Sequence, residues 1–328
     1  YGAQLEGLFP DIAFRKVDLS NIEQTGELLR DTKPSVIFNS TSLQSYWVIE
    51  LLPKEIHRKF QKAGYGPWVP MHLTLCYNLM QAVKQSGICT QVVNGSYPDA
   101  VNPILGKIGL APAAGIGNLD LIIPQIRNIA ANSIKVHPRH VDPMLVMHHY
   151  AEYWIVREGH TGGAPYCLKI YLHGQDITSQ LNADQIFQEI IQSAARPGRP
   201  DSHYMVASSA VQKIIAIYNN SDELSHVAGP AGMIGGYPAL INSKGSTVQL
   251  PVGLSMGDAI KINEAGQYLE GIEAIHEDGS VSFTDKSSEI MKDLIGYDCR
   301  KMALSESQER AKELGLLYKA FIAKHSLN

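Results

Sequence analysis

The sequence predicts an α/β protein, with a doubly wound parallel sheet in residues 1–132 and an α+β domain in residues 133–328. In the first part, short apolar segments that suit strands alternate with longer segments of helical periodicity. In the second part, Pro and Gly separate segments rich in β-branched and aromatic residues. A chain of 328 residues is long enough for two domains with a buried core.

Three segments near the N-terminus begin the alternation. Residues 12–19 alternate apolar and polar side chains, which predicts a strand. Residues 21–30 predict a helix with Ser20 or Asn21 as its N-cap. Residues 34–40 predict a second and more buried strand.

The same alternation continues through the next ninety or so residues, with a helix at 71–86, a strand at 91–94 and a helix at 119–131. A dinucleotide-binding sheet normally begins with a strand that runs into a glycine-rich loop. No segment before Ile12 has that pattern. We therefore expect the first β-α-β unit of the sheet to be missing from this chain.

The second half predicts strands first and helices later. We expect antiparallel strands at Pro143–Arg157 and Pro165–Leu172, helices at Ala183–Ala194 and Tyr204–Tyr218, a strand at Thr247–Leu254, and a helix at Ser305–Lys324. Ser305 is followed three residues later by Gln308, which is typical of a capping box at the start of a helix. This half would form the substrate domain.

The composition excludes several classes of protein. Lys+Arg number 28 against 32 Asp+Glu, for a net charge of -4, so we expect no nucleic-acid partner. The four cysteines are widely spaced without a C-x-x-C pair, which favours a reducing cytoplasm over a disulfide framework. No apolar run approaches the roughly 20 residues that span a bilayer, so we expect no membrane segment.

Three motifs follow one another in a recognisable order. A strand ends in the turn Ser96-Tyr97-Pro98, a glycine turn leads into Leu119-Asp120, and His148-His149 comes about one strand later. This order resembles the lactate/malate dehydrogenase superfamily, which also contains the NAD-dependent family 4 glycoside hydrolases. The resemblance implies a Rossmann-like domain, NAD or NADP as cofactor, a small-molecule substrate, and a homo-oligomer, either a dimer or a tetramer.

The resemblance implies a catalytic pair of a carboxylate and an imidazole. Asp120 matches the aspartate that orients the proton-accepting histidine, and either His148 or His149 falls near the matching position. On a strand the two rings would point to opposite faces, so only one could meet Asp120, and we favour His149. The alternative is that both histidines are ordinary strand residues and that Asp120 is a helix cap.

Other positions depart from the family pattern. Ile123 stands where the resemblance places the arginine that binds a substrate carboxylate, so a simple 2-hydroxy acid is disfavoured. Arg127, one turn further along the helix, is either an anion contact or a surface arginine. Tyr97 replaces an asparagine, and its hydroxyl would contact substrate. Tyr204 begins a helix that resembles one lining the pocket, which makes it a third candidate for substrate binding.

Polar residues at two strand ends are the candidates for cofactor binding. The resemblance implies that Asn94 and Ser96 border the nicotinamide ribose, and Asn39 and Ser40 end the preceding strand. The long segment that follows corresponds to a mobile lid. Its aromatic residues suit stacking on a sugar or a packed cluster beneath a loop, and they are Trp47, Tyr65 and Trp68.

We expect no metal site, because His137-x-x-His140 lies in a loop without an adjacent third ligand. The sequence therefore predicts an NAD(P)-dependent oxidoreductase that acts on a secondary alcohol or ketone other than a simple 2-hydroxy acid. One alternative is a family 4-like glycoside hydrolase, although no cysteine falls at the matching turn. The other is a non-catalytic scaffold that retains the fold.

Overall fold

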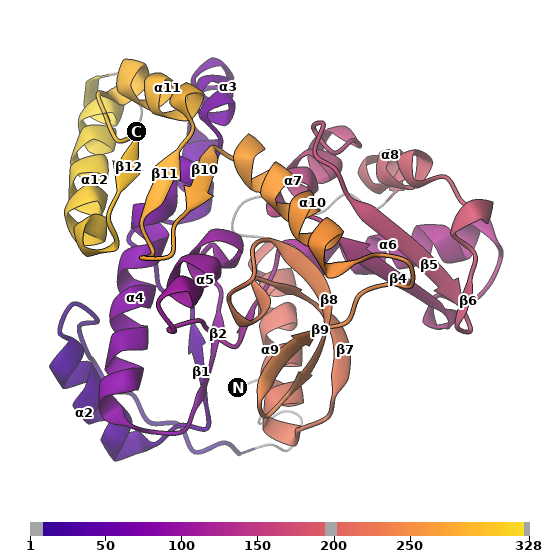
Figure 1. The fold of residues 1–328 in the computed structure, drawn as a ribbon, viewed down its shortest axis with the longest axis horizontal. Helices are drawn as coiled ribbons and strands as arrows, with labels where there is room; N and C mark the ends of the chain where they lie inside the picture. The colour runs from indigo at the N-terminus through magenta and orange to yellow at the C-terminus, as the bar shows by residue number, and fades with distance from the viewer. Residues whose placement is uncertain (1–8, 194–201, 325–328) are drawn as a thin grey trace.

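The computed structural model describes residues 9–193 and 202–324 of the chain. Its largest element is a six-stranded sheet in the order β1-β2-β3-β7-β8-β9 (Figure 1). Strands β1 (Val36–Asn39), β2 (Gln91–Asn94) and β3 (Ala114–Gly115) are parallel. Strands β7 (Glu223–Ala228), β8 (Gly236–Asn242) and β9 (Gly245–Val248) continue the sheet with antiparallel pairing. The predicted boundary near residue 132 thus falls between strands that share one sheet.

Helices cover both faces of the parallel strands, as the sequence predicts. Neighbouring residues on a strand point to opposite faces, and on β2 Val92 packs into the cluster around α4 (Val69–Ser86) while Val93 packs into the cluster around α9 (His203–Asn219). Helix α2 (Ile22–Thr32) lies against α4 and is capped by the Asn21 side chain. The α/β class with a parallel sheet is confirmed.

A second sheet forms beside the first. Strands β4 (Val141–Val146), β5 (Cys167–Leu172) and β6 (Gln175–Asp176) are antiparallel. Helices α6 (Leu119–Ser133), α7 (His149–Glu158) and α8 (Ala183–Ser193) pack around a common apolar cluster with β4 and β5. Helix α6 also contacts β7, so it joins the two sheets.

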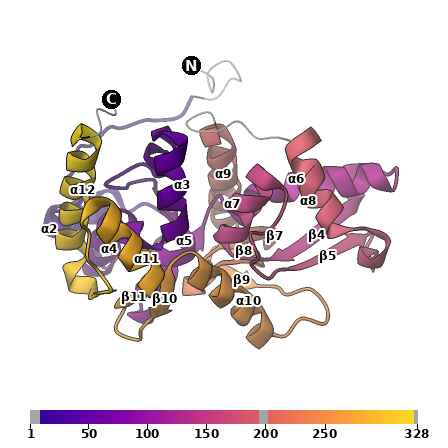
Figure 2. The same ribbon diagram turned by 90° about the horizontal axis from the view of Figure 1, so that it is seen from above.

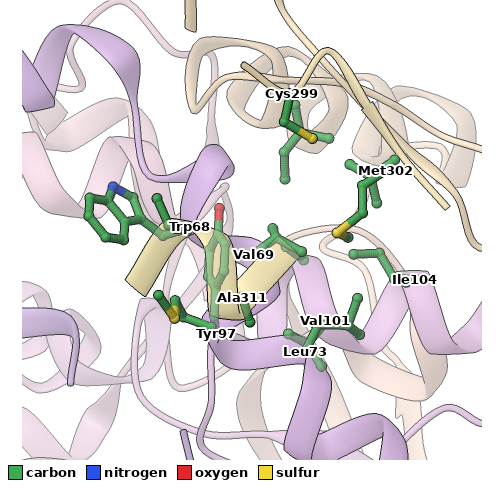
Figure 3. Packing of buried hydrophobic residues seen from close by; sticks show 14 of the residues in the cluster. Trp68, Val69, Leu73, Tyr97, Val101, Ile104, Cys299, Met302 and Ala311 are labelled. Carbon is green, nitrogen blue, oxygen red and sulfur yellow. The ribbon is translucent and has the colours of Figure 1, made fainter. Parts of the chain in front are cut away.

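The chain after α10 (Met256–Leu269) forms a compact C-terminal unit, residues 270–324. It consists of the hairpin β10 (Ile272–Ile275) and β11 (Val281–Phe283), helix α11 (Asp285–Ile295), β12 (Lys301–Met302) and helix α12 (Ser307–Lys324). In Figure 2 this unit lies beside α3 (Lys54–Ala63), and α11 and α12 contact α3 and α4 respectively. Figure 3 shows its Cys299 and Met302 gathered in one core with residues of α4 and α5 (Pro98–Lys107).

Three secondary-structure predictions are wrong. Residues 12–18 form no strand, because Ile12 and Phe14 are exposed and no neighbouring strand pairs with them. The strand expected at 143–157 ends at Val146, and α7 replaces its second half because the His148 side chain accepts a hydrogen bond from the Tyr150 backbone and caps the helix. The strand expected at 247–254 ends at Val248, before Pro251, which has no N–H to pair.

The other expected segments match helices and strands of the structure, with ends that differ by a few residues, and several further elements, among them α5, β7 and α10, have no predicted counterpart. The presumed lid is helical: the 3-10 turns η1 (Tyr46–Leu51) and η2 (Gly66–Trp68) flank α3. The last residue of the helix expected at 183–194 lies outside the described residues. Among the described helices, none combines the length and the apolar character that crossing a membrane requires.

Candidate active site

The three parallel strands end at one edge of the sheet, where ligands bind in open α/β folds. Asn39 ends β1 and Asn94 ends β2, and the Asn39 side-chain amide donates to Asn94 Oδ1 at 2.9 Å. The Asn94 amide donates in turn to Asn102 Oδ1 at 2.9 Å. All three are buried, so their polar groups bind one another and form the floor of this edge. Ser40 follows Asn39 and is exposed.

The Ser96 side chain belongs to a buried hydrogen-bonded chain above that floor. His72 Nδ1 lies 3.1 Å from Ser96 Oγ, and its Nε2 lies 2.7 Å from the Tyr65 hydroxyl. Burial lowers the pKa of His72 to about 4, so the ring is neutral at physiological pH. Of the four predicted cofactor residues, only Ser40 therefore has an exposed side chain.

Tyr97 has a backbone conformation that is rare for an aromatic residue. Its φ of 44° and ψ of 57° lie in the left-handed region, which costs roughly 1–2 kcal/mol for a residue with a Cβ. The ring packs edge-on against Tyr65 at 5.0 Å and against His149 at 6.1 Å between centroids. The Tyr97 hydroxyl is buried and has no hydrogen-bond partner among the described residues. Strain beside an unused polar group is typical of a functional site.

His149 is the first residue of α7 and contacts two carboxylates. Its backbone N–H donates to Asp99 Oδ1 at 3.3 Å, and its Nδ1 lies 3.2 Å from Glu270 Oε2. The side chain keeps 21% of its surface exposed. Burial alone would lower the pKa of His149, but the Glu270 carboxylate outweighs it and raises that pKa to about 9. The ring is therefore mostly protonated at neutral pH.

His148 has a different environment, although it is adjacent in sequence. Its Nδ1 accepts the Tyr150 backbone N–H and lies 3.6 Å from Glu270 Oε2. The ring is buried, and burial lowers its pKa despite the nearby acids. Because Nδ1 is an acceptor and the side chain is 1% exposed, His148 is a capping residue. Of the two histidines, only His149 keeps part of its side chain exposed.

Glu270 joins three segments at this site. Its carboxylate accepts the Tyr65 backbone N–H at 3.3 Å, and its backbone carbonyl accepts the Gly66 N–H at 2.8 Å. Burial raises the pKa of this carboxyl group, but His149 outweighs that effect and the pKa falls below its usual value. Helix α10 can bring Glu270 this close because Gly266 faces His148, where a Cβ would lie only 2.2 Å from the His148 Cβ.

The predicted pairing of Asp120 with a histidine is wrong. Asp120 Oδ2 lies 2.5 Å from Lys213 Nζ, and Oδ1 lies 3.5 Å from Ser225 Oγ. The Lys213 side chain is fully buried, and without this carboxylate its charge would have no counterion. Asp120 therefore extends from α6 toward α9, while Asp99 and Glu270 are the acids beside the histidines.

The predicted substrate residues other than Tyr97 lie elsewhere. Arg127 donates from Nε to the Val141 carbonyl at 2.9 Å and lines a cavity between α6, β4, α9 and β7. Tyr204 is 84% exposed in the first turn of α9. Ile123 packs in the core around α6, so no anion contact replaces the missing arginine at that position. No hydrogen bond or ring contact links Arg127 or Tyr204 to His149 in the described part of the chain.

The presumed lid is held in place. Phe60 and Trp68 pack against Tyr318 and Phe321 of the C-terminal unit, so Trp68 belongs to the main core rather than to a sugar-binding surface. Only Tyr65 of the three proposed stacking residues contacts the site. Trp47 lies half-buried in η1.

Sequence reasoning missed Glu270, Asp99 and His72. Asp99 follows the Ser96-Tyr97-Pro98 turn directly, and its place in the first turn of α5 could have suggested a role. Glu270 lies 121 residues from its histidine partner, so no local pattern indicates the contact. Within residues 9–193 and 202–324 no group of three or more His, Cys, Asp or Glu is arranged to hold a metal.

Comparisons with known proteins support the fold. No family model matches the chain, and neither does any curated protein sequence. Among solved structures, the malate dehydrogenase from Aeropyrum pernix is 15% identical, with 82% of each chain covered and a TM-score of 0.51. The malate dehydrogenase from Plasmodium falciparum in complex with NADH is 12% identical over 95% of this chain and 84% of the other, with a TM-score of 0.47. The first likeness shows that this chain has a lactate/malate dehydrogenase-like fold.

Proposed function

We propose that this protein is an NAD(P)-dependent oxidoreductase that interconverts a secondary alcohol and a ketone, with His149 as the proton-transfer residue. The observation that carries the proposal is the placement of His149. Its partly exposed ring lies beside the ends of the parallel strands, hydrogen-bonded to Glu270 and packed edge-on against the ring of Tyr97, whose hydroxyl has no partner among the described residues. The same edge of the sheet holds the site in proteins of this fold class.

The Glu270 carboxylate would set the tautomer and the orientation of the His149 imidazole. The carboxylate accepts a hydrogen bond from the Nδ1–H group, which leaves Nε2 to exchange a proton with a substrate oxygen. In the reducing direction, the protonated ring would donate that proton to the ketone oxygen. In the oxidising direction, neutral Nε2 would take the proton from the alcohol hydroxyl. Glu270 would thus do what the sequence assigned to Asp120.

The edge of the sheet fits the reactive end of a nicotinamide. Gly117, two residues after β3, has open space where a Cβ would lie, and Ser40 is exposed at the end of β1. The Tyr97 hydroxyl is a buried donor with no partner among the described residues, on a ring that packs against His149. Asn39 and Asn94 would support this surface from below. A bound nicotinamide would supply or accept the hydride, while His149 handles the proton.

The substrate is proposed to lack the carboxylate of a 2-hydroxy acid. Ile123 is buried at the position where such a substrate would need an arginine. The Tyr97 hydroxyl would instead donate to or accept from a neutral oxygen on the substrate. A bulkier secondary alcohol that carries further hydroxyl groups suits this arrangement.

The decisive experiment measures binding first and turnover second. Calorimetric titration of the full-length protein with NADH and NADPH tests the cofactor, and a panel of hydroxylated ketones tests the substrate. His149→Gln should lower kcat by roughly 10²–10⁴-fold, the usual contribution of a general acid or base. His160→Gln, an exposed histidine just after the same helix, is the matched control and should keep full activity. Failure of both cofactors to bind would overturn the proposal.

Assembly remains a prediction. A dimer or tetramer, a cytoplasmic location and a small-molecule substrate with neither nucleic acid nor membrane as partner follow from the sequence. Light scattering of the purified protein would test the oligomeric state directly.

A further inference from the structure

A cavity among the described residues lies outside the His149 site. It measures about 830 Å³ and is enclosed by α6, the β4-β5 sheet, α9, β7 and the segment after β9. These elements lie together on the side of the molecule away from the C-terminal unit (Figure 1). His149, Tyr97 and Glu270 do not line it. A function of this cavity would be separate from proton transfer at His149.

The inner wall of the cavity is neutral. Asp120, Gln212 and Ser225 line it, and Lys213 lies behind them. The Lys213 ammonium donates to all three, at 2.5, 3.2 and 2.9 Å. The Lys213 ammonium and the Asp120 carboxylate therefore neutralise each other, and this wall has no net charge with which to bind a ligand.

His226 adds no charge either. Burial lowers the pKa of His226 to about 3, and its Nε2 accepts the Leu145 backbone N–H. The rest of the lining is mainly apolar, with Ile123, Pro124, Met144 and Leu250. A ligand would therefore meet an apolar surface with few polar contacts.

Arg127 is the cation of the lining that has no carboxylate partner among the described residues. Its Nε donates to the Val141 carbonyl, which fixes the guanidinium at the edge of β4. No hydrogen bond from its terminal nitrogens is found in the described part of the chain. Asp142, one residue beyond that carbonyl, lines the same cavity and is exposed. It would oppose an anion and weaken its binding.

We propose that this cavity binds a small amphipathic carboxylate, with its carboxylate on Arg127 and its apolar body against Ile123, Met144 and Leu250. An arginine binds a carboxylate through two parallel hydrogen bonds, and the apolar wall removes the hydrocarbon part from water. The volume of about 830 Å³ is within the range of small-molecule sites.

The test uses anilinonaphthalene sulfonate, a fluorescent apolar anion, and its displacement by octanoate. Octanoate should displace the probe, and octanol should do so much less well because it has no charge. Arg127→Gln should weaken octanoate binding about tenfold, the effect of losing a charge-assisted contact. Asp142→Asn should strengthen it, because an opposing charge is removed. The two substitutions thus move the affinity in opposite directions.

Controls separate this proposal from misfolding and from the proposed function. Arg139→Gln removes an exposed arginine outside the cavity and should leave binding unchanged. Met144→Trp fills the cavity and should abolish binding, with circular dichroism confirming the fold. His149→Gln should have no effect on the probe. Equal displacement by octanol and octanoate, or unchanged affinity in both Arg127→Gln and Met144→Trp, would overturn the proposal.

Discussion

Two buried charged clusters lie at either side of α6, and they differ in how completely their polar groups are used. Around Asp120, the Lys213 ammonium has three acceptors and each acceptor has a donor. Around His149, the Tyr97 hydroxyl and His148 Nε2 have no partner among the described residues. A saturated cluster holds elements together, whereas an unsaturated one retains groups for a ligand. The first cluster therefore holds α6 and α9 together, and the unpartnered groups of the second support the proposed site at His149.

The largest effect is expected from breaking the saturated cluster. Lys213→Met leaves the partly buried Asp120 carboxylate without its cation and should lower the free energy of unfolding by roughly 3–5 kcal/mol. Urea denaturation followed by circular dichroism would measure it. Lys169→Met is the control, because the Lys169–Asp176 pair is exposed and should cost less than about 1 kcal/mol. Equal costs for the two variants would show that Lys213 is not a structural cation.

A smaller effect is expected from acid on the unsaturated cluster. The pKa of His72 is about 4 in the folded protein against 6.5 unfolded, so the unfolded state binds the proton first. The contribution of neutral His72 to stability is therefore complete above pH 6.5 and falls by about 3 kcal/mol as the pH drops to 4. Denaturation at several pH values measures how the free energy of unfolding changes between pH 6.5 and 4. His72→Gln should reduce this change, whereas His137→Gln, at an exposed histidine, should leave it the same.

The third prediction concerns the charge of His149. Glu270→Gln removes the main carboxylate that raises the pKa of His149 to about 9, so this pKa should fall toward the value that burial favours. NMR titration of the histidine ring protons would follow it. Ketone reduction needs the protonated ring, so its rate should decline as the pH rises past the pKa of His149. This decline should begin at a lower pH in Glu270→Gln than in the wild type, where it is expected near pH 9. Glu264→Gln, exposed on the same helix, is the control, and a pKa unchanged in Glu270→Gln would refute the pairing.

The smallest effect on stability is expected from Tyr97→Phe. Its hydroxyl has no partner, so its removal should change the free energy of unfolding by less than about 0.5 kcal/mol. Tyr65→Phe loses the bond to His72 and should cost about 1 kcal/mol. If Tyr97→Phe also leaves substrate binding intact in the turnover assay, the hydroxyl is not kept for a ligand.

Local patterns predicted much of the fold. Helices α4, α6 and α9 follow from apolar periodicity, and β1 and β2 from short apolar runs between polar turns. The segment around His148 and His149 was misassigned because a short apolar run suits a strand or a buried helix equally, and side-chain capping decided the outcome. Residues 12–19 had a strand pattern but no neighbouring strand to pair with.

The site was harder to predict than the fold, because its contacts connect distant parts of the chain. The choice of His149 as the proton-transfer residue stays a prediction, and the acid beside it is Glu270 and not Asp120. Asp120 and Lys213 are 93 residues apart, and the only local sign of their pairing is a lysine within the apolar segment of α9. A buried ammonium group needs a carboxylate partner, and Asp120 fills that need here although the motif suggests a catalytic role for Asp120. The order of the motifs indicated which segments form the proposed site. The pairing of buried charges determined which carboxylate lies beside Lys213 and which lies beside His149.

Gly266 limits how this protein can be improved. In the middle of a helix, replacing glycine by alanine usually adds up to about 1 kcal/mol of helix stability. In α10 the added methyl group would lie 2.2 Å from the His148 Cβ and would push the helix outward. The helix would carry Glu270 away from His149 as it moved. A substitution at Gly266 that makes the α10 backbone more rigid would therefore lower the pKa of His149.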